Sequence, residues 1–347
     1  MIMKLIYSIS RSILCLSCIA VAAASCAKDF TYGKYYSTDK VLDAWVETHY
    51  GPVAKDTSGI YILEEIPGSG KKVNDSSFVF VNYTCKSLYM EVSSTNDSAL
   101  LEMDGSLDGS AAYTTYLGPR IWRMGQGALP YGVESALRRM KEGGKIKIAL
   151  PVERTKVDYT IYQQFSSTQV DNVIYDLHLV RVHDDIGAYQ DSLLREHSRK
   201  YFGGIDTVFD GFYIAKTGCA AEADSLEDDE VVDIRYIGRR LDGTVFDTNI
   251  IDSAYVYNLS SVSTDSLVFT YYKDGVKMYN NNLSYISGFS AAINRMRHRD
   301  TIEAFFRSDY GYGVAGNGAS IPEFSPLSFK IFIQESKSSD DSGDEED

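Results

Sequence analysis

Residues 231–247 of this chain are Val-Val-Asp-Ile-Arg-Tyr-Ile-Gly-Arg-Arg-Leu-Asp-Gly-Thr-Val-Phe-Asp. The first six residues are mostly β-branched or aromatic, which predicts a strand. Part of this strand, Ile234–Gly238, has a counterpart earlier in the chain at Val81–Cys85, with Tyr236 matching Tyr83. The same local pattern therefore occurs twice.

Further matches follow in the same order and at nearly constant spacing. They pair Gly59–Ile62 with Gly211–Ile214, Ala136–Met140 with Ala292–Met296, and Ile174–Leu177 with Ser328–Ile331. Ordered matches of this kind indicate an internal duplication. We therefore predict a first domain at residues 57–185 and a second at residues 209–336, joined by a linker at residues 186–208 that is helical up to Tyr201.

Each repeat is rich in strands and contains one short helix. The predicted helices are Val133–Lys141 and Phe289–Arg297, and the predicted strands are Phe78–Tyr83, Lys145–Pro151, Val173–Val182, Val231–Tyr236, Thr301–Phe306 and Leu327–Ile333. Several antiparallel strands with a single short helix predict an α+β domain with the helix packed on one face of a twisted sheet.

The second repeat resembles FKBP-type peptidyl-prolyl isomerases over nearly its whole length. The resemblance depends on six segments in a fixed order, Ile234–Gly238, Leu241–Asp247, Ile286–Phe289, Asp309–Gly313, Ile321-Pro322 and Leu327–Phe329. It implies two FKBP-like domains in tandem, the second with an isomerase pocket that needs no cofactor and no metal.

The resemblance also assigns the residues of that pocket. The apolar cup would consist of Tyr236, Phe246, Ile286, Phe289, Ile321 and Phe329. Phe289 would be its floor, where the family most often has Trp. Tyr312 and the Ile286 N–H would donate hydrogen bonds to a substrate carbonyl, and Asp247 would be the polar group of the wall.

Two features depart from the family pattern. The stretch at residues 248–285 is longer than the family usually has, and the family's aromatic residue on the strand before Ile286 has no clear match; the insert's role stays open. In the first repeat, Met103-Asp104-Gly105 occupies the region of the Phe-Asp pair and Val133 occupies the floor position. We therefore expect the first domain to keep the fold without the pocket, as a spacer, a dimerising face or a binding surface.

The N-terminus has the layout of an exported lipoprotein. Lys4 and Arg11 precede the apolar run Ile13–Ala24, as in a secretory signal peptide of residues 1–25. The segment Ala23-Ala24-Ser25-Cys26 resembles a bacterial lipobox, which would make Cys26 the lipidated first residue. The alternative is ordinary signal cleavage beside an incidental cysteine. Residues 26–56 would be a tether, polar and aromatic from Phe30 to Thr38, followed by a helix that begins at Ser37 or Thr38 and buries Val41, Leu42, Trp45 and Val46.

Charge and cysteine content exclude other classes of function. The net charge is −14, which disfavours nucleic acid as a partner. Residues 337–347 form an acidic segment that we expect to be disordered. After the signal peptide and Cys26, only Cys85 and Cys219 remain, so neither a CxxC zinc site nor a disulfide framework is expected.

The sequence thus predicts a lipid-anchored protein of the cell envelope, on the periplasmic or surface face of the outer membrane. Its partners would be the membrane, through the lipid, and proline-containing exported polypeptides, whose X–Pro bonds the second domain would isomerise. The alternative is a non-catalytic chaperone or binding protein that uses the fold as a scaffold. The oligomeric state stays open.

Overall fold

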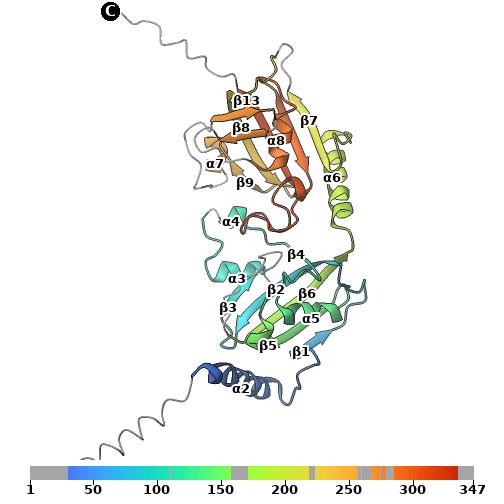
Figure 1. Ribbon diagram of the computed structural model, residues 1–347, viewed down its shortest axis with the longest axis vertical. Helices are drawn as coiled ribbons and strands as arrows, with labels where there is room; N and C mark the ends of the chain where they lie inside the picture. Colours follow the sequence, from blue (N-terminus) through green and yellow to red (C-terminus); the bar gives the residue numbers. More distant parts are fainter. Residues whose placement is uncertain are drawn as a thin grey trace, which may run out of the picture.

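The computed structural model describes residues 30–109, 111–157, 171–218, 223–256, 259, 268–273, 275–278 and 285–334. They form two α+β domains, one above the other in Figure 1, each built on an antiparallel sheet. Helix α6 (Ile186–Phe202) joins them and lies along the side of the second domain, next to β7. The signal peptide, Cys26 and the acidic tail lie outside the described residues.

The first sheet has the strand order β1-β5-β6-β2-β3, with β4 also paired to β2. Its strands are β1 (Tyr61–Ile66), β2 (Phe78–Ser87), β3 (Val92–Thr95), β4 (Arg120–Arg123), β5 (Lys145–Leu150) and β6 (Val173–His183). Its helical segments are α3 (Ser98–Met103), α4 (Ala111–Thr114), α5 (Tyr131–Arg139) and the 3-10 turn η1 (Val152–Arg154). The predicted strands and the helix α5 are confirmed to within a few residues.

The second sheet has the strand order β11-β10-β8-β13-β12-β7, with β9 also paired to β8. Its strands are β7 (Phe212–Gly218), β8 (Glu230–Arg240), β9 (Val245–Thr248), β10 (Val268–Tyr272), β11 (Gly275–Met278), β12 (Thr301–Phe306) and β13 (Leu327–Gln334). Its helical segments are α7 (Ile251–Val256), α8 (Ser287–Ile293) and the 3-10 turn η2 (Ser308–Tyr310). Here α8 ends at Ile293, earlier than the predicted Arg297.

The two sheets repeat each other, except that β11 has no counterpart in the first sheet. The order β1-β5-β6-β2 in the first domain matches β7-β12-β13-β8 in the second. The strands β3 and β9 pair with the later half of β2 and β8, and β4 and β10 pair with the earlier half. The internal repeat inferred from the sequence is therefore also present in the strand pairing.

Each domain has a Thr-Asn pair that makes similar hydrogen bonds to the backbone where the chain leaves the third strand. Asn249 accepts a hydrogen bond from the Tyr236 N–H at 2.8 Å and donates to the Ile234 carbonyl at 2.6 Å. In the first domain Asn96 accepts from the Tyr83 N–H at 2.8 Å and donates to the Gly118 carbonyl at 2.9 Å. The neighbouring hydroxyls of Thr248 and Thr95 donate to the carbonyls of Tyr236 and Tyr83. These bonds anchor the chain just after β3 and β9.

A glycine brings each helix close to its sheet. A Cβ on Gly288 would lie 2.5 Å from the Phe306 ring, and one on Gly132 would lie 2.4 Å from the Leu150 side chain. Only glycine allows such an approach. The residue after each glycine, Phe289 or Val133, is consequently held fully buried at the start of its helix.

The predicted linker helix is confirmed as α6. Asp185 caps its first turn by accepting a hydrogen bond from the Ala188 N–H at 3.0 Å, and Gly203 ends it in the left-handed region at φ 71°. Leu194 is fully buried on its inner side.

The N-terminal helix differs from its prediction. Helix α2 covers Phe30–Tyr50, so the segment expected to be a tether is helical and Ser37 lies inside the helix. No Pro interrupts residues 30–50, and adding turns to an existing helix costs little. Leu42 and Val46 are buried on the sheet, but Val41 is 57% exposed because it lies beyond the edge of the buried stripe.

Among the described residues, none of the helices has the length and apolar character needed to cross a bilayer.

We predict that Asn249→Ala and Asn96→Ala each lower the free energy of unfolding by about 1–3 kcal/mol, because each leaves buried backbone groups without partners. Denaturant titration followed by circular dichroism measures the change. The exposed Asn74→Ala serves as the control and should cost less. Wild-type stability in both buried variants would contradict this role.

Candidate functional site

The floor of the predicted cup is a buried ring at the start of α8. Phe289 is fully buried and lies edge-on to Tyr236 at 5.3 Å and to Phe329 at 5.4 Å between ring centroids. Tyr236 comes from β8 and Phe329 from β13, two neighbouring strands of the sheet. Helix and sheet thus contribute to one aromatic cluster on the inner face.

The other predicted residues of the cup join the same cluster. Phe246, Ile286 and Tyr312 are partly buried against it, and Ile321 is 2% exposed within it. Phe246 lies edge-on to Phe329 at 5.6 Å. This approach depends on Gly238, where a Cβ would lie 2.8 Å from the Phe246 ring and 3.0 Å from the Phe329 ring. All the predicted apolar residues are therefore brought together.

Asp247 is connected to the cluster through a tyrosine. The Tyr236 hydroxyl donates a hydrogen bond to Asp247 Oδ2 at 2.7 Å. Burial raises the pKa of Asp247 above its usual range, and the hydrogen bonds from Tyr236 and the Thr248 N–H offset only part of that rise. The residue keeps an exposed side, so the carboxylate lies at the boundary between the aromatic cluster and solvent.

Three tyrosines surround this carboxylate. Burial, followed by the charge of Asp247, raises the pKa of Tyr285 to about 12 and also raises the pKa of Tyr236. Burial raises the pKa of Tyr312, whose side chain is hydrogen-bonded to Asn317. Hydroxyls with raised pKa values stay protonated and act as hydrogen-bond donors. The arrangement suits binding of a polar group without proton transfer.

The backbone adds a further donor at the same place. Ile286 precedes the first turn of α8 with extended geometry at φ −56° and ψ 145°. Within the part of the chain that the structure describes, no group accepts a hydrogen bond from the Ile286 N–H. The Ile286 N–H is therefore a candidate hydrogen-bond donor at the start of α8.

Two aromatic residues of the cluster were not predicted from the sequence. Tyr285 lies 5.0 Å from Phe289 between ring centroids, and Phe269 lies 6.1 Å from it. Phe269 is on β10, which precedes Ile286 in the chain. It is therefore a candidate for the family's aromatic residue before Ile286, for which the sequence showed no clear match. The first domain has the same arrangement, since Trp122 pairs with Val79 as Phe269 pairs with Val232, but this equivalence is visible only in the strand pairing.

The first domain has the same scaffold with different side chains at these positions. Strand pairing places Ser94 opposite Cys85, as Asp247 lies opposite Gly238. Ser94, and not Asp104, therefore stands in the place of Asp247, and it is hydrogen-bonded to the Tyr83 hydroxyl. Val133 replaces the Phe289 ring, as the sequence indicated.

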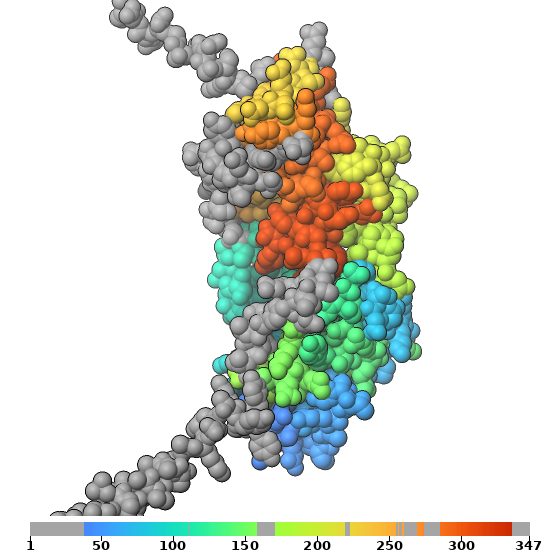
Figure 2. Space-filling model, in the orientation of Figure 1, coloured from blue at the N-terminus to red at the C-terminus, as the bar shows by residue number. Residues whose placement is uncertain are grey.

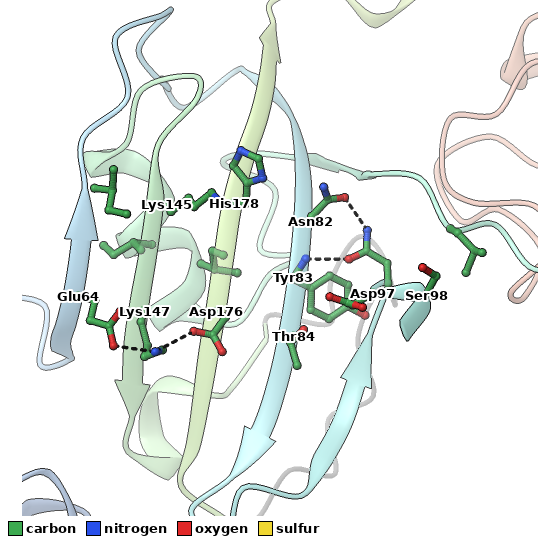
Figure 3. Close-up of a pocket in the computed structure, with 15 residues that line it drawn as sticks. Glu64, Asn82, Tyr83, Thr84, Asp97, Ser98, Lys145, Lys147, Asp176 and His178 are labelled. Atoms are coloured by element: carbon green, nitrogen blue, oxygen red, sulfur yellow. Dashed lines mark hydrogen bonds and ion pairs between the residues drawn. The ribbon is translucent and has the colours of Figure 1, made fainter. Parts of the chain in front are cut away.

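A polar cavity of about 520 Å³ lies on the other face of the first sheet. Figure 3 shows its floor, where Lys147 bridges Glu64 at 2.7 Å and Asp176 at 3.6 Å, and Asn96 donates to Asn82. Because most of its lining side chains are polar and several are hydrogen-bonded to one another, it fits a prolyl amide less well than a cluster of aromatic rings does. The aromatic cluster of the second domain is the better candidate site.

Among the described residues, no group of three or more His, Cys, Asp or Glu side chains is placed to hold a metal ion.

Comparison with known proteins gives a sequence match that covers this site. Residues 222–334 match the model of the FKBP-type peptidyl-prolyl cis-trans isomerase family. The chain is also 30% identical over 103 residues to the macrophage infectivity potentiator of Trypanosoma cruzi, a match that covers 30% of this chain and 41% of that relative.

Solved structures of the family are also similar. A peptidyl-prolyl cis-trans isomerase from Pseudomonas syringae matches at 23% identity with a TM-score of 0.32, covering 43% of this chain and 92% of that one. FkpA from Escherichia coli matches at 17% identity with a TM-score of 0.32, covering 50% of this chain and 71% of that one. The three FKBP domains of wheat FKBP73 match at 16% identity with a TM-score of 0.27, covering 80% of this chain and 94% of that one. The family assignment rests on the sequence match to the second domain.

We predict that Asp247→Asn stabilises the protein at neutral and alkaline pH. The folded-state pKa of Asp247 is raised, so ionisation is less favourable in the folded than in the unfolded chain and lowers stability as pH rises. The gain from Asn should be greatest above the folded-state pKa and should vanish below the unfolded pKa of about 3.9.

Denaturant titrations at several pH values measure this difference. The exposed Asp108→Asn provides the control. A destabilised Asp247→Asn variant at pH 8 would show that the hydrogen bond from Tyr236 outweighs the burial of the charge.

Proposed function

We propose that this protein, whose second domain belongs to the FKBP-type peptidyl-prolyl cis-trans isomerase family, catalyses cis–trans isomerisation of X–Pro bonds in exported polypeptides. The observation that carries the proposal is the Phe289 floor, ringed by Tyr236, Tyr285 and Phe329, with Asp247 hydrogen-bonded to the Tyr236 hydroxyl beside it. No cofactor or metal enters the reaction.

The chemistry needs only differential binding. Rotation about an X–Pro bond faces a barrier of about 18–20 kcal/mol, which arises from the loss of amide resonance. A site that binds the twisted amide better than either planar isomer lowers this barrier without an acid, a base or a nucleophile. The aromatic cluster excludes water from the amide, and the prolyl ring would lie against Phe289.

The polar groups of the rim would hold the peptide around that ring. The Ile286 N–H and the Tyr312 hydroxyl donate hydrogen bonds to substrate carbonyls. Asp247, held by Tyr236, presents negative charge beside the amide and favours the orientation in which the twisted carbonyl dipole points away from it. The position of these groups around the Phe289 ring and the polarity of a twisted amide support these roles.

The first domain supports a second candidate function. It keeps the sheet and helix but has Ser94 and Val133 where the second domain has Asp247 and Phe289. A protein that used both domains only to hold unfolded segments would need no isomerase pocket. In that non-catalytic chaperone, the rings around Phe289 would serve only as core.

An isomerisation assay separates the two functions. With the chain from residue 27 onward and a prolyl tetrapeptide, we expect acceleration over the uncatalysed rate. Tyr312→Phe should lower kcat/KM about fivefold, because it removes a neutral hydrogen bond. Asp247→Ala should lower kcat/KM about tenfold, because it removes a charged one. Tyr131→Phe, on the exposed surface of the first domain, is the matched control.

A wild-type protein that does not accelerate the reaction would exclude the enzyme and leave the chaperone function. An active wild type with unchanged Tyr312→Phe and Asp247→Ala variants would instead exclude these residues as the site. Circular dichroism of each variant shows that the fold is kept.

We also propose that the protein is anchored to the cell envelope by lipid on Cys26, with exported, proline-containing polypeptides as its substrates. Two or more acyl chains would hold it stably on a membrane. In bacterial cells given labelled palmitate, we expect incorporation into the wild-type chain and none into Cys26→Ser. Equal labelling of both would exclude this anchor, and Cys85→Ser serves as the control cysteine variant.

A further inference from the structure

The segment Tyr312–Phe324 has two roles in the structure. It carries Tyr312 and Ile321 of the proposed pocket, and it is also a principal contact between the second domain and the first. Figure 2 shows this part of the chain, in red, directly against the first domain. We call it the pocket loop.

A buried ion pair joins the pocket loop to the first domain. Arg120, on β4, donates from Nε to Glu323 Oε2 at 2.9 Å and from Nη2 to Oε1. Glu323 is only 2% exposed. A carboxylate buried this deeply is tolerated only with a well-matched partner, and the planar guanidinium supplies two parallel hydrogen bonds. The pair therefore fixes the position of Glu323 relative to β4.

A second set of contacts holds the rim of the pocket next to Ile321. The Tyr116 N–H donates to the Ala319 carbonyl at 2.8 Å. Arg240, at the end of β8, donates from Nη1 to the carbonyls of Thr114 and Ser320. The segment after α4 in the first domain is thus tied to the residues that precede Ile321.

The third contact holds a strained residue. Phe324 has φ 57°, a backbone conformation that is costly for a bulky side chain and persists only where its surroundings enforce it. Its ring lies edge-on to Phe78 of the first domain at 5.2 Å. Its N–H donates to the Gly313 carbonyl at 2.8 Å, next to Tyr312. Packing against the first domain is therefore transmitted through one hydrogen bond to the base of Tyr312.

The linker helix holds the start of the same region. Gln190 on α6 is 2% exposed and makes two hydrogen bonds with Ser308, from its Nε2 to the hydroxyl at 2.9 Å and from the Ser308 N–H to its Oε1 at 2.8 Å. The Gly313 N–H in turn donates to the Ser308 carbonyl at 2.8 Å. Both ends of the pocket loop are anchored outside the second domain.

From these contacts we infer that the first domain positions the pocket loop for catalysis, with Arg120 as the central positioning residue, so that the two domains form one catalytic unit. The inference rests on the proposed isomerase function. Arg120 touches no substrate; it acts through Glu323 and the loop that places Tyr312 and Ile321. A first domain without a pocket of its own would thus be required for the activity of the second.

The test replaces Arg120 in the chain from residue 27 onward. We expect Arg120→Met to lower kcat about tenfold with a smaller change in KM, since a small displacement of a positioned group weakens transition-state binding most. Amide hydrogen exchange should become faster at residues 313–324 and stay unchanged in β8. Lys71→Met removes an exposed ion pair of the first domain, the one with Asp184, and should leave both measurements unchanged.

A second variant covers the case in which Arg120→Met does not fold because Glu323 is left buried and unpaired. Arg120→Lys keeps the charge but loses the paired hydrogen bonds, and we expect it to lower kcat about threefold. Wild-type kcat in a folded Arg120 variant, with or without faster exchange in the loop, would overturn the inference while leaving the isomerase function intact. A wild-type chain without isomerase activity would overturn both.

Discussion

The close approach of helix α8 to its sheet is the constraint on which the site depends. Gly288 lies against the Phe306 ring, where no larger residue fits, and Phe289 is thereby buried among rings from the sheet. A second glycine, Gly238, leaves room for Phe246 and Phe329 to meet above it. The absence of a side chain at these two glycines thus determines where the aromatic surface lies and how deep it is. The polar groups are confined to the rim because the interior offers them no partners.

The duplication separates what the fold requires from what the site requires. Both domains keep a glycine against the sheet and the Thr-Asn pair after the third strand. They differ at the residues that would face a substrate, where Ser94, Cys85 and Val133 replace Asp247, Gly238 and Phe289. A side chain at the position of Gly238 would clash with Phe246 and Phe329, so Cys85 is incompatible with that arrangement of rings. Within one chain, the shared residues hold the scaffold and the differing residues define the candidate pocket.

The sequence predicted the fold and most of the cup because both depend on local patterns. Alternating apolar residues and a fixed repeat spacing located the strands, and short motifs located residues such as Tyr236 and Phe289. Phe269 was missed because it follows Asp247 by 22 residues, whereas Trp122 follows Ser94 by 28, so that it falls outside the constant spacing; only its pairing with Val232 reveals it. The bond between Arg120 and Glu323 joins residues 203 positions apart, and neither residue stands in a motif. Contacts of that kind depend on how the domains pack, which no local pattern encodes.

The residues on the outer face of the first sheet reflect how the two domains pack against each other. Antiparallel sheets usually present polar residues on a face that is open to water. Phe78 and Phe80 on β2 lie on that outer face and are only 8% and 7% exposed, because Phe324 and Tyr189 cover them. The equivalent positions on β8 are Val231, which is 39% exposed, and Asp233, and both tolerate water. A free first domain would expose two large rings side by side, a surface that favours aggregation. The second domain and helix α6 therefore explain these two residues, and the Phe78 ring that packs against Phe324 also helps to hold the pocket loop in place.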